Sequence, residues 1–536
     1  MFENHKQIRE TASCRNGSDP QTGADTENKR KAGSCEGRFP EERSRMAESV
    51  SKDISQVERR VQALCEGCAD ITVRPMKIGA VHPVDCLVVY NETAVGNMLL
   101  EDSVIGKMLN HFWKMEPEQI IETVRQDGLG ISDVKELQSM EEAIQAVLAG
   151  NAVFFLNGYG HALKIGGKGY PDMGVPQAES EKGLRGSREA FGESVKMNTA
   201  LVRKRLRSTQ MKVEEQVVGE ASHTMLNLVY MEGLVYPELL EEIRSRLQNI
   251  SPDGVMDSGV IEQLMQDVWY SPFPQFQTTE RPDKAASALL DGRILLLCDN
   301  TPVGLLLPTT MNSLMQTGDD YYGNFEIASL LRCIRYLAIF LAFSFPGLYL
   351  AVTGFHPQIL PVNLILSMAE SRRGVPFAAL AEVLFLEISF ELMREAGLRM
   401  PGPIGNMIGI VGGLIIGQAA VTANLISPMI VIVDALTALG SFSIPNEELS
   451  EAFRILKYGM IVLCGFFGIY GFVAGWLALL IHLAGLRSFG IPYLMPFAAG
   501  ERDGISEWSD GIFRAPMRRM NRRPVYARRE VRNRNK

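Results

Sequence analysis

The chain has 536 residues, a formal net charge of -8 and 46% hydrophobic residues. This length allows roughly two to four domains at about 150 residues each. The averages alone exclude few classes of protein, because residues up to about 330 have a soluble composition whereas residues 335–495 are strongly apolar.

The first 45 residues are rich in Ser, Gly, Asn and charged side chains. They contain no apolar core of the kind that a secretory signal peptide needs, and such a composition predicts disorder. We therefore expect residues 1–45 to be a disordered tail and the soluble half of the chain to remain in the cytoplasm.

Residues 46–330 alternate between strand-like and helical patterns, which predicts two α/β subdomains, at 46–169 and 209–330, joined by a linker and a helix at 170–208. In the first subdomain we expect strands at 71–73, 86–90 and 152–156 and helices around 105–125 and 133–149. In the second we expect strands at 212–219, 224–230, 294–298 and 303–307 and a helix at 237–249. Asn157-Gly158-Tyr159-Gly160 and Asp299-Asn300-Thr301-Pro302 predict hairpin turns.

The apolar half predicts an all-α transmembrane domain over residues 331–497, with four to six membrane segments. A helical span needs about 20 apolar residues to cross about 30 Å. Residues 336–355 suit one crossing, 400–433 suit two that are broken near 424–428, and 458–486 suit a last long one. Segment 375–393 carries three glutamates, so we expect either a crossing or a re-entrant or interfacial segment there.

Residues 498–536 form a basic tail, in which residues 514–536 carry nine arginines and one lysine against Glu530 alone. Positive charge beside a span favours the cytoplasmic side. Both termini are therefore expected in the cytoplasm, which requires an even number of crossings. We expect this tail to contact anionic lipid headgroups rather than nucleic acid.

Four glycines, Gly405, Gly409, Gly413 and Gly417, recur every four residues within the uncharged stretch 400–433. In a soluble helix each would cost about 1 kcal/mol relative to alanine. In a membrane, small residues on one face let two helix backbones approach closely. The pattern therefore predicts a membrane helix that packs tightly on a neighbour.

Three glutamates, Glu382, Glu387 and Glu391, lie in an apolar helical segment. Glu387 and Glu391 share one face, whereas Glu382 lies about 140° away from Glu387 around the helix. A carboxylate at the bilayer centre is costly unless it faces water or a partner. One interpretation is an acid-lined cation pathway, and the other is an interfacial helix whose acids face headgroup water or pair with Arg394 and Arg399.

Asp434 is the lone charge of residues 400–446. It is a second candidate for the ion pathway, and the alternative is a satisfied polar contact with a neighbouring helix. Gln418 and Asn424 are expected to be polar intramembrane residues that hydrogen-bond between helices.

The sequence contains no constellation that predicts catalysis or metal binding. Cys65 and Cys68 form its one CxxC pair, and no second pair lies at the spacing of a four-ligand zinc site. The common phosphate-binding, zinc-protease and serine-hydrolase motifs are absent as well. We therefore expect no catalytic residues, no metal, no cofactor and no enzymatic activity.

From about residue 50 to about 497 the sequence resembles the A subunit of the GerA family of spore germinant receptors. The resemblance rests on Arg185-Gly186-Ser187-Arg188-Glu189 with Asn198-Thr199, Phe273-Pro274-Gln275, Thr279-Glu280-Arg281-Pro282-Asp283, Asp319-Asp320-Tyr321-Tyr322, Phe355-His356-Pro357, Phe390-Glu391, Arg394-Glu395-Ala396-Gly397, PIGNMIGIVGGLIIGQAAV and Pro492-Tyr493-Leu494. A SpoVAF-like homologue is a close relative that shares the fold. Asp434 departs from the family pattern, in which an apolar residue is expected.

The resemblance implies two cytoplasmic subdomains, a bundle of membrane helices and a cytoplasmic tail, in the cell membrane or spore inner membrane. It implies a homo-oligomer, with a pentamer as the expected form, that works with a transporter-like B subunit and a lipoprotein C subunit. The implied activity is a nutrient-gated cation channel that triggers ion release in germination. The residues alone leave two alternatives open, which are a secondary transporter of a small solute or ion and a non-conducting scaffold for receptor assembly.

Overall fold

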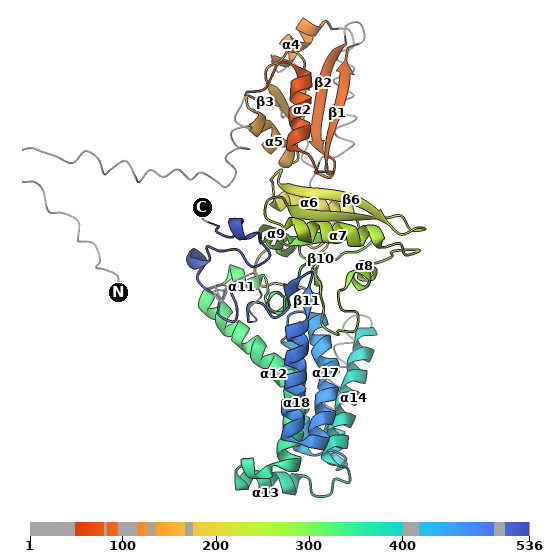
Figure 1. The fold of residues 1–536 in the computed structure, drawn as a ribbon, viewed down its shortest axis with the longest axis vertical. Coiled ribbons are helices and arrows are strands. Elements are labelled where there is room, and N and C mark those ends of the chain that lie inside the picture. The colour runs from red at the N-terminus through yellow and green to blue at the C-terminus, as the bar shows by residue number, and fades with distance from the viewer. Residues whose placement is uncertain are drawn as a thin grey trace, which may run out of the picture.

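The computed structural model describes residues 49–79, 83–94, 115–125, 134–166, 175–399, 417–497 and 510–534. The chain forms two α/β units and a helical unit, stacked along the long axis of the molecule (Figure 1). The expected disordered tail at 1–45 lies outside the described residues, as do Gly405, Gly409 and Gly413.

The first unit is an antiparallel sheet whose strand order is β1-β2-β4-β5-β3. Its elements are α2 (Ile54–Leu64), β1 (Ile71–Ile78), β2 (Val84–Asn91), α4 (Pro117–Arg125), β3 (Val134–Leu137), α5 (Met140–Leu148), β4 (Ala152–Leu156) and β5 (Ala162–Ile165). Successive residues of β4 alternate between the two faces. Val153 and Phe155 pack with α2 and α5, while Phe154 and Leu156 pack in the core on the other face. This burial on both sides explains why β4 is apolar throughout.

The second unit repeats this arrangement, with the strand order β6-β7-β9-β10-β8. Its elements are α6 (Val195–Arg205), β6 (Met211–Val218), β7 (Thr224–Met231), α7 (Pro237–Asn249), α8 (Ser258–Met265), β8 (Gln277–Thr279), α9 (Pro282–Leu290), β9 (Ile294–Cys298) and β10 (Gly304–Leu307). In both units a helix leads into the first strand of the sheet, and another helix lies between the edge strand and the strand that follows it. The expected hairpins are present as the β4–β5 and β9–β10 pairs.

Two features of the α/β units differ from the expectations. Where one helix was expected at 133–149, the structure has strand β3 followed by helix α5. Val134–Leu137 is a strand because it pairs with β5, and local periodicity cannot reveal such a distant partner. The helix expected within 170–208 is α6, which packs on the second sheet through Leu201 and Val202. It therefore belongs to the second unit.

A buried ion pair joins the two α/β units. The Arg203 guanidinium on α6 donates from Nε and Nη2 to the two carboxylate oxygens of Asp70, each at 2.7 Å. The side chains of Arg203 and Asp70 are 0% and 2% exposed. Asn91 donates to the same carboxylate, and Arg203 Nη1 donates to the Ser208 carbonyl. Beside this pair, Cys68 and Val213 form a bridge between the units.

The thiols of the CxxC pair lie in the core of the first unit. Burial raises the pKa of the Cys65 thiol to about 12. A protonated thiol is neither a nucleophile nor a metal ligand, so this position disfavours both roles.

The helical unit follows the second sheet and the chain then returns to it. Its elements are α10 (Met311–Met315), α11 (Asp319–Tyr322), α12 (Phe325–Phe355), η2 (Pro357–Ile359), α13 (Val362–Ser371), α14 (Ala379–Arg399), α16 (Pro428–Phe442), α17 (Glu447–Phe467), α18 (Ile469–Gly485), β11 (Arg487–Ser488) and β12 (Ile491–Pro492). Within the described ranges, α12 alone has the length and apolar composition that suffice to cross a membrane, while α16 and α18 are apolar but shorter. Since α12 begins and α18 ends beside the second unit (Figure 1), the chain enters and leaves the helical unit at the same end.

The single long span expected at 458–486 is wrong. The structure has two helices there, α17 and α18, and Gly468 between them has φ 59°, a backbone conformation that favours glycine. A Cβ at Gly471 would come within 2.1 Å of the Leu463 carbonyl oxygen, so glycine allows the two helices to pack closely. The first half of α17 was missed because it carries charged residues that an apolar span would exclude.

The basic tail packs on the second unit instead of extending away from it. It contains the short helices η3 (Met517–Arg519) and η4 (Arg529–Val531). Arg523 donates to the Leu290 carbonyl and Arg528 to the Val235 carbonyl, while Arg514 donates to the Gly323 carbonyl. These three guanidinium groups are bound within the protein, and the expected contact of the tail with lipid headgroups stays a prediction.

The Arg203–Asp70 pair should be the contact between the α/β units that is most sensitive to substitution. Arg203→Met leaves the Asp70 carboxylate buried without its cation, which should destabilise the docked units by about 3–5 kcal/mol. We expect the thermal unfolding midpoint of the full chain in detergent to fall, and the double variant Arg203→Met, Asp70→Asn to recover most of the loss.

The matched control for this prediction is Lys77→Met, because the Lys77–Asp85 pair is 73% and 51% exposed. An exposed pair contributes under about 1 kcal/mol to stability, so the thermal unfolding midpoint of Lys77→Met should stay near that of the wild type. Equal effects of Lys77→Met and Arg203→Met would contradict the assigned role.

Candidate functional site

Two of the predicted acids meet inside the helical unit. Glu387 on α14 forms a buried ion pair with Lys457 on α17, and the other carboxylate oxygen of Glu387 has no hydrogen-bond partner among the described residues. Asp434 on α16 is buried as well and interacts electrostatically with Glu387 and Lys457. Two carboxylates thus share one ammonium group, so the cluster carries an excess of negative charge when all three groups are ionised.

Glu382 lies one and a half turns earlier on α14 and has a different environment. One of its oxygens accepts a hydrogen bond from Arg372 at 2.8 Å, and the other accepts one from the Ser427 backbone N–H at 2.9 Å. Ser427 is the N-cap residue of α16, where a negative charge is stabilising. Glu382 therefore ties the start of α16 to α14 and to the chain after α13.

Glu391 is the most accessible of the three glutamates, with 37% of its side chain exposed. Its carboxylate lies 3.5 Å from the Arg454 guanidinium on α17, and Arg394 lies 3.6 Å from Glu451. The predicted pairing partners were Arg394 and Arg399. In the structure Arg399 instead pairs with Glu395 on the same helix.

The other predicted residues of this region lie apart from the acids. Gly417 is buried, and a Cβ there would meet Val431 at an ordinary contact distance of 3.7 Å. Gln418 and Asn424 are exposed in the single chain. Asn424 has φ 53° and lies in the turn before Pro428, where the sequence indicates a break. The expected hydrogen bonds of Gln418 and Asn424 between helices stay a prediction.

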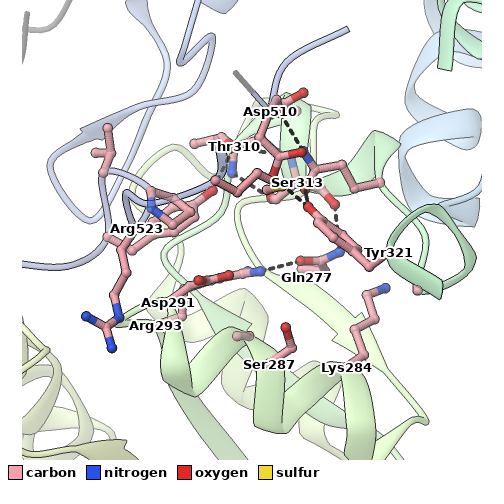
Figure 2. A pocket seen from close by; sticks show the side chains of 18 of the residues that line it. Gln277, Lys284, Ser287, Asp291, Arg293, Thr310, Ser313, Tyr321, Asp510 and Arg523 are labelled. Carbon is pink, nitrogen blue, oxygen red and sulfur yellow. Dashed lines mark hydrogen bonds between the residues drawn. The ribbon is translucent and has the colours of Figure 1, made fainter. Parts of the chain in front are cut away.

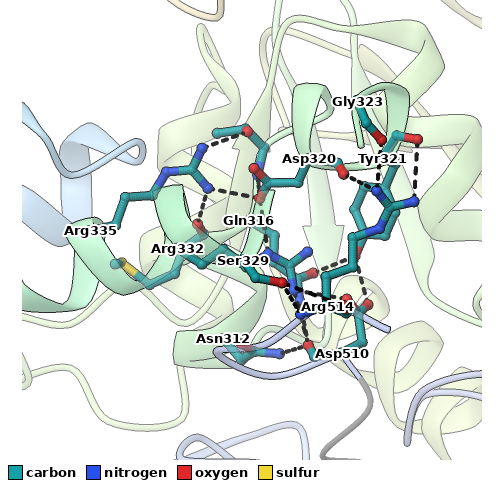
Figure 3. Close-up of polar contacts among 12 residues, drawn as sticks. Asn312, Gln316, Asp320, Tyr321, Gly323, Ser329, Arg332, Arg335, Asp510 and Arg514 are labelled. Atoms are coloured by element: carbon teal, nitrogen blue, oxygen red, sulfur yellow. Dashed lines mark hydrogen bonds and ion pairs between the residues drawn. The ribbon is translucent and has the colours of Figure 1, made fainter. Parts of the chain in front are cut away.

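A second polar centre lies where α12 leaves the second unit (Figure 3). The Asp320 carboxylate on α11 accepts hydrogen bonds from Arg332 at 3.1 Å and from Arg335 at 2.7 Å, both on α12. Arg332 also donates to the Asp510 carboxylate at 2.8 Å, and Tyr321 donates to the other oxygen of Asp510 at 2.7 Å. We call Asp320, Tyr321, Arg332, Arg335 and Asp510 the junction cluster.

The electrostatics of the junction cluster favour ionised side chains. Burial would raise the pKa of Asp320, but the hydrogen bond from Arg335 and the charges of Arg335 and Arg332 outweigh it and hold the pKa below the ordinary 3.8. The Arg332 guanidinium lies 5.6 Å from the centre of the Tyr321 ring, so the ring adds a cation–π contact. The cluster therefore fastens the first turns of α12 to α11 and to the tail.

A cavity of about 310 Å³ adjoins the junction cluster (Figure 2). Its lining includes Gln277 from β8, Arg293 just before β9, Lys284 from α9, Tyr321 from α11 and Arg523 from the tail. This volume falls at the small end of the range for ligand pockets, and the five side chains just named are polar or charged. The tail closes one side, so access to the cavity depends on where the tail lies.

Sequence reasoning missed Lys457, Arg332 and Asp510. Lys457 directly precedes the expected span at 458–486, and Arg332 lies four residues before the expected span at 336–355. Both were therefore treated as boundaries rather than as buried groups. Asp510 has no local signal, because its partner is 178 residues away in sequence.

Comparisons with known proteins place the chain among spore germination proteins. The family model described as Bacillus/Clostridium GerA spore germination protein matches residues 59–526. The uncharacterized membrane protein YfkQ of Bacillus subtilis (strain 168) is 38% identical over 475 residues, which cover 89% of this chain and 91% of that protein. Spore germination protein KA of the same strain is 33% identical over 476 residues, covering 89% and 86%.

One solved structure also matches. The N-terminal domain of the A subunit of the Bacillus megaterium spore germinant receptor GerK3 aligns with 49% of this chain and 97% of its own length, at 26% identity and a TM-score of 0.38.

Removing the central cation of the junction cluster should release the tail. Arg332→Met leaves the Asp510 carboxylate without its cation and Asp320 with Arg335 alone. We expect trypsin to cut the tail at Arg518 and Arg519 at least several-fold faster in the full-length variant than in the wild type. Arg399→Met is the control, because the Arg399–Glu395 pair is exposed. Unchanged cleavage in Arg332→Met would show that the tail is held by other contacts.

The junction cluster should also weaken in acid. Because the folded pKa of Asp320 lies below the ordinary 3.8, its ion pairs contribute stability that is present above about pH 4 and is lost as the pH falls through the folded pKa. The thermal unfolding midpoint of the full chain should therefore be lower in buffers below about pH 4 than at pH 7. Asp320→Asn should have a lower midpoint at pH 7 and a smaller drop in acid. An identical acid profile in both proteins would contradict the assignment.

Proposed function

We propose a function from one premise, which is that the chain belongs to the GerA family of Bacillus/Clostridium spore germination proteins. This membership confirms the resemblance that the motifs carry. We propose that the protein is the A subunit of a spore germinant receptor and works with a transporter-like B subunit and a lipoprotein C subunit. In this proposal several copies assemble in the membrane into a cation channel, which opens when the receptor detects its nutrient.

Membership of the family and the match to a membrane protein support a membrane location for the helical unit. The apolar composition of α12, α16 and α18 supports it further. In the proposed arrangement these helices cross the bilayer and the two α/β units remain in the cytoplasm. The entry and exit of the chain at the same end of the helical unit agree with an even number of crossings.

The observation that carries the channel proposal is the row of acids on α14. Glu387 and Asp434 place two carboxyl groups beside one ammonium group, that of Lys457, in the interior of the helical unit. Glu391 lies one turn from Glu387 on the same face, with 37% of its side chain exposed. Carboxylates in an apolar setting select cations over anions, and rings of them line cation channels. A ring of Glu391 side chains around an oligomer axis is the arrangement that we propose.

The junction cluster offers a route from the cytoplasmic units to the helices. Asp320 lies on α11, which contacts the second unit because the Tyr322 hydroxyl donates to Asp283 of α9 at 2.8 Å. Arg332 and Arg335 are part of α12, and Asp510 brings the tail to the same point. A displacement of the second unit would therefore be transmitted to α12. We propose that the subunit acts in this way without any enzymatic reaction.

The test is cation release from spores that carry the complete receptor. Glu391→Gln removes the charge but keeps the shape, so the rate of K⁺ release after the addition of nutrient broth should fall several-fold. Glu395→Gln is the matched control on the same helix, because Glu395 is also paired with an arginine and is exposed. It should release K⁺ at the wild-type rate.

Both variants must be present in the spore membrane at the wild-type level, which immunoblotting measures. If Glu391→Gln is present at that level and releases K⁺ at the wild-type rate, the ion pathway does not use this residue. If the complete wild-type receptor releases no K⁺, the channel proposal fails.

A further inference from the structure

A loop between α8 and β8 holds two large aromatic side chains in an exposed position. Trp269 is 83% exposed and Tyr270 is 68% exposed. Their rings touch edge to face, with centroids 5.9 Å apart. Isolated apolar side chains on a surface need no explanation, but an adjacent Trp–Tyr pair is a large amphipathic surface that either water or a partner must cover.

The loop is rigid on both sides of the aromatic pair. The buried Gln275 side chain accepts hydrogen bonds from the backbone N–H groups of Asp267 and Val268 at 2.8 and 3.1 Å and donates to the Val268 carbonyl at 2.8 Å. Phe273, which follows the pair, is buried against Phe453 of α17. The exposure of Trp269 and Tyr270 is therefore imposed by the fold.

The loop also lies against the end of α18. Ser271 Oγ is 2.8 Å from His482 Nε2, and the rings of Tyr270 and His482 have centroids 6.4 Å apart. His482 lies in the last turn of α18, which ends at Gly485. The aromatic pair thus sits at the end of this helix that faces the second unit.

One face of α18 presents apolar side chains to the outside, and this face leads to the loop. Val473, Leu477, Leu480 and Ile481 are all exposed and are spaced three or four residues apart or adjacent, as one helical face requires. The sequence of α18, IYGFVAGWLALLIHLAG, contains no Asp, Glu, Lys or Arg. In the proposed membrane location this face contacts lipid tails.

We propose that Trp269 and Tyr270 lie in the headgroup layer of the cytoplasmic leaflet and set the depth of the helical unit in the bilayer. The inference rests on the proposed membrane location of that unit. Indole and phenol rings combine an apolar body with a polar N–H or O–H group, and both residues concentrate at the boundary between hydrocarbon and water. The pair occupies this boundary, since the apolar face of α18 lies on one side of it.

A charged residue at the start of the loop, Asp267, makes contacts that fix the loop. Asp267 pairs with Arg246 of α7, and Asp267 also accepts a hydrogen bond from the Phe489 N–H at 2.8 Å. These contacts tie the loop to the second unit. An anchored loop would therefore hold the second unit at a fixed height above the membrane.

Depth-dependent fluorescence quenching tests the proposal in the full chain, reconstituted into phosphatidylcholine vesicles. The signal of Trp269 is the difference between the wild type and Trp269→Phe, a substitution that keeps an exposed aromatic ring and the fold. We expect this difference spectrum to be blue-shifted relative to tryptophan in water. Lipids brominated near the headgroup should quench it more than lipids brominated near the chain ends, and aqueous iodide should quench it weakly.

A second probe separates this inference from the membrane location itself. Leu477→Trp, in the Trp269→Phe background, places an indole on the exposed face of α18, and lipids brominated near the chain ends should quench it strongly. If this probe is quenched by lipid and Trp269 is quenched by iodide alone, the loop lies in water and the inference is wrong. If neither quencher reaches Trp269, another protein surface covers it, which also overturns the proposal. If lipid quenches neither probe, the membrane location of α18 fails too.

Discussion

Buried charge that must be paired connects the parts of this molecule. Arg203 of the second unit is matched by Asp70 of the first, Arg332 of α12 by Asp320 and Asp510, and Lys457 of α17 by Glu387 of α14. Removing a charge from water costs several kcal/mol, which is offset only when the partner is in place. Each pair is therefore satisfied only when two elements are docked correctly. This constraint selects one arrangement of the units over others that would bury similar apolar area.

Local patterns in the sequence were sufficient to predict many of the strands and turns of the two α/β units. Runs of apolar residues identified β4, β9 and β10, and the turn residues at 157–160 and 299–302 identified two hairpins. The edge strand β3 was missed because its identity depends on pairing with β5. The repeat of one strand order in both units was missed as well, because strand order depends on pairing between segments that are distant in sequence.

The helical part was less predictable for a related reason. Hydropathy finds stretches that avoid charge, and α17 carries charge that is neutralised by α14. The sequence singled out Glu387 and Asp434 separately, but their proximity arises from the packing of α14, α16 and α17, and Lys457 completes the group. Glu382, by contrast, lies outside this group, and its carboxylate accepts a hydrogen bond from the backbone at the start of α16.

The return of the tail to α12 has a consequence for biosynthesis. The ribosome makes Asp510 178 residues after Arg332, when every helix from α12 to α18 has already been synthesised. The junction cluster around Arg332 is therefore incomplete throughout the synthesis of all these helices. A subunit in mid-translation would hold α12 more loosely than a finished one, so that maturation of the polypeptide itself would decide when the helix becomes fixed.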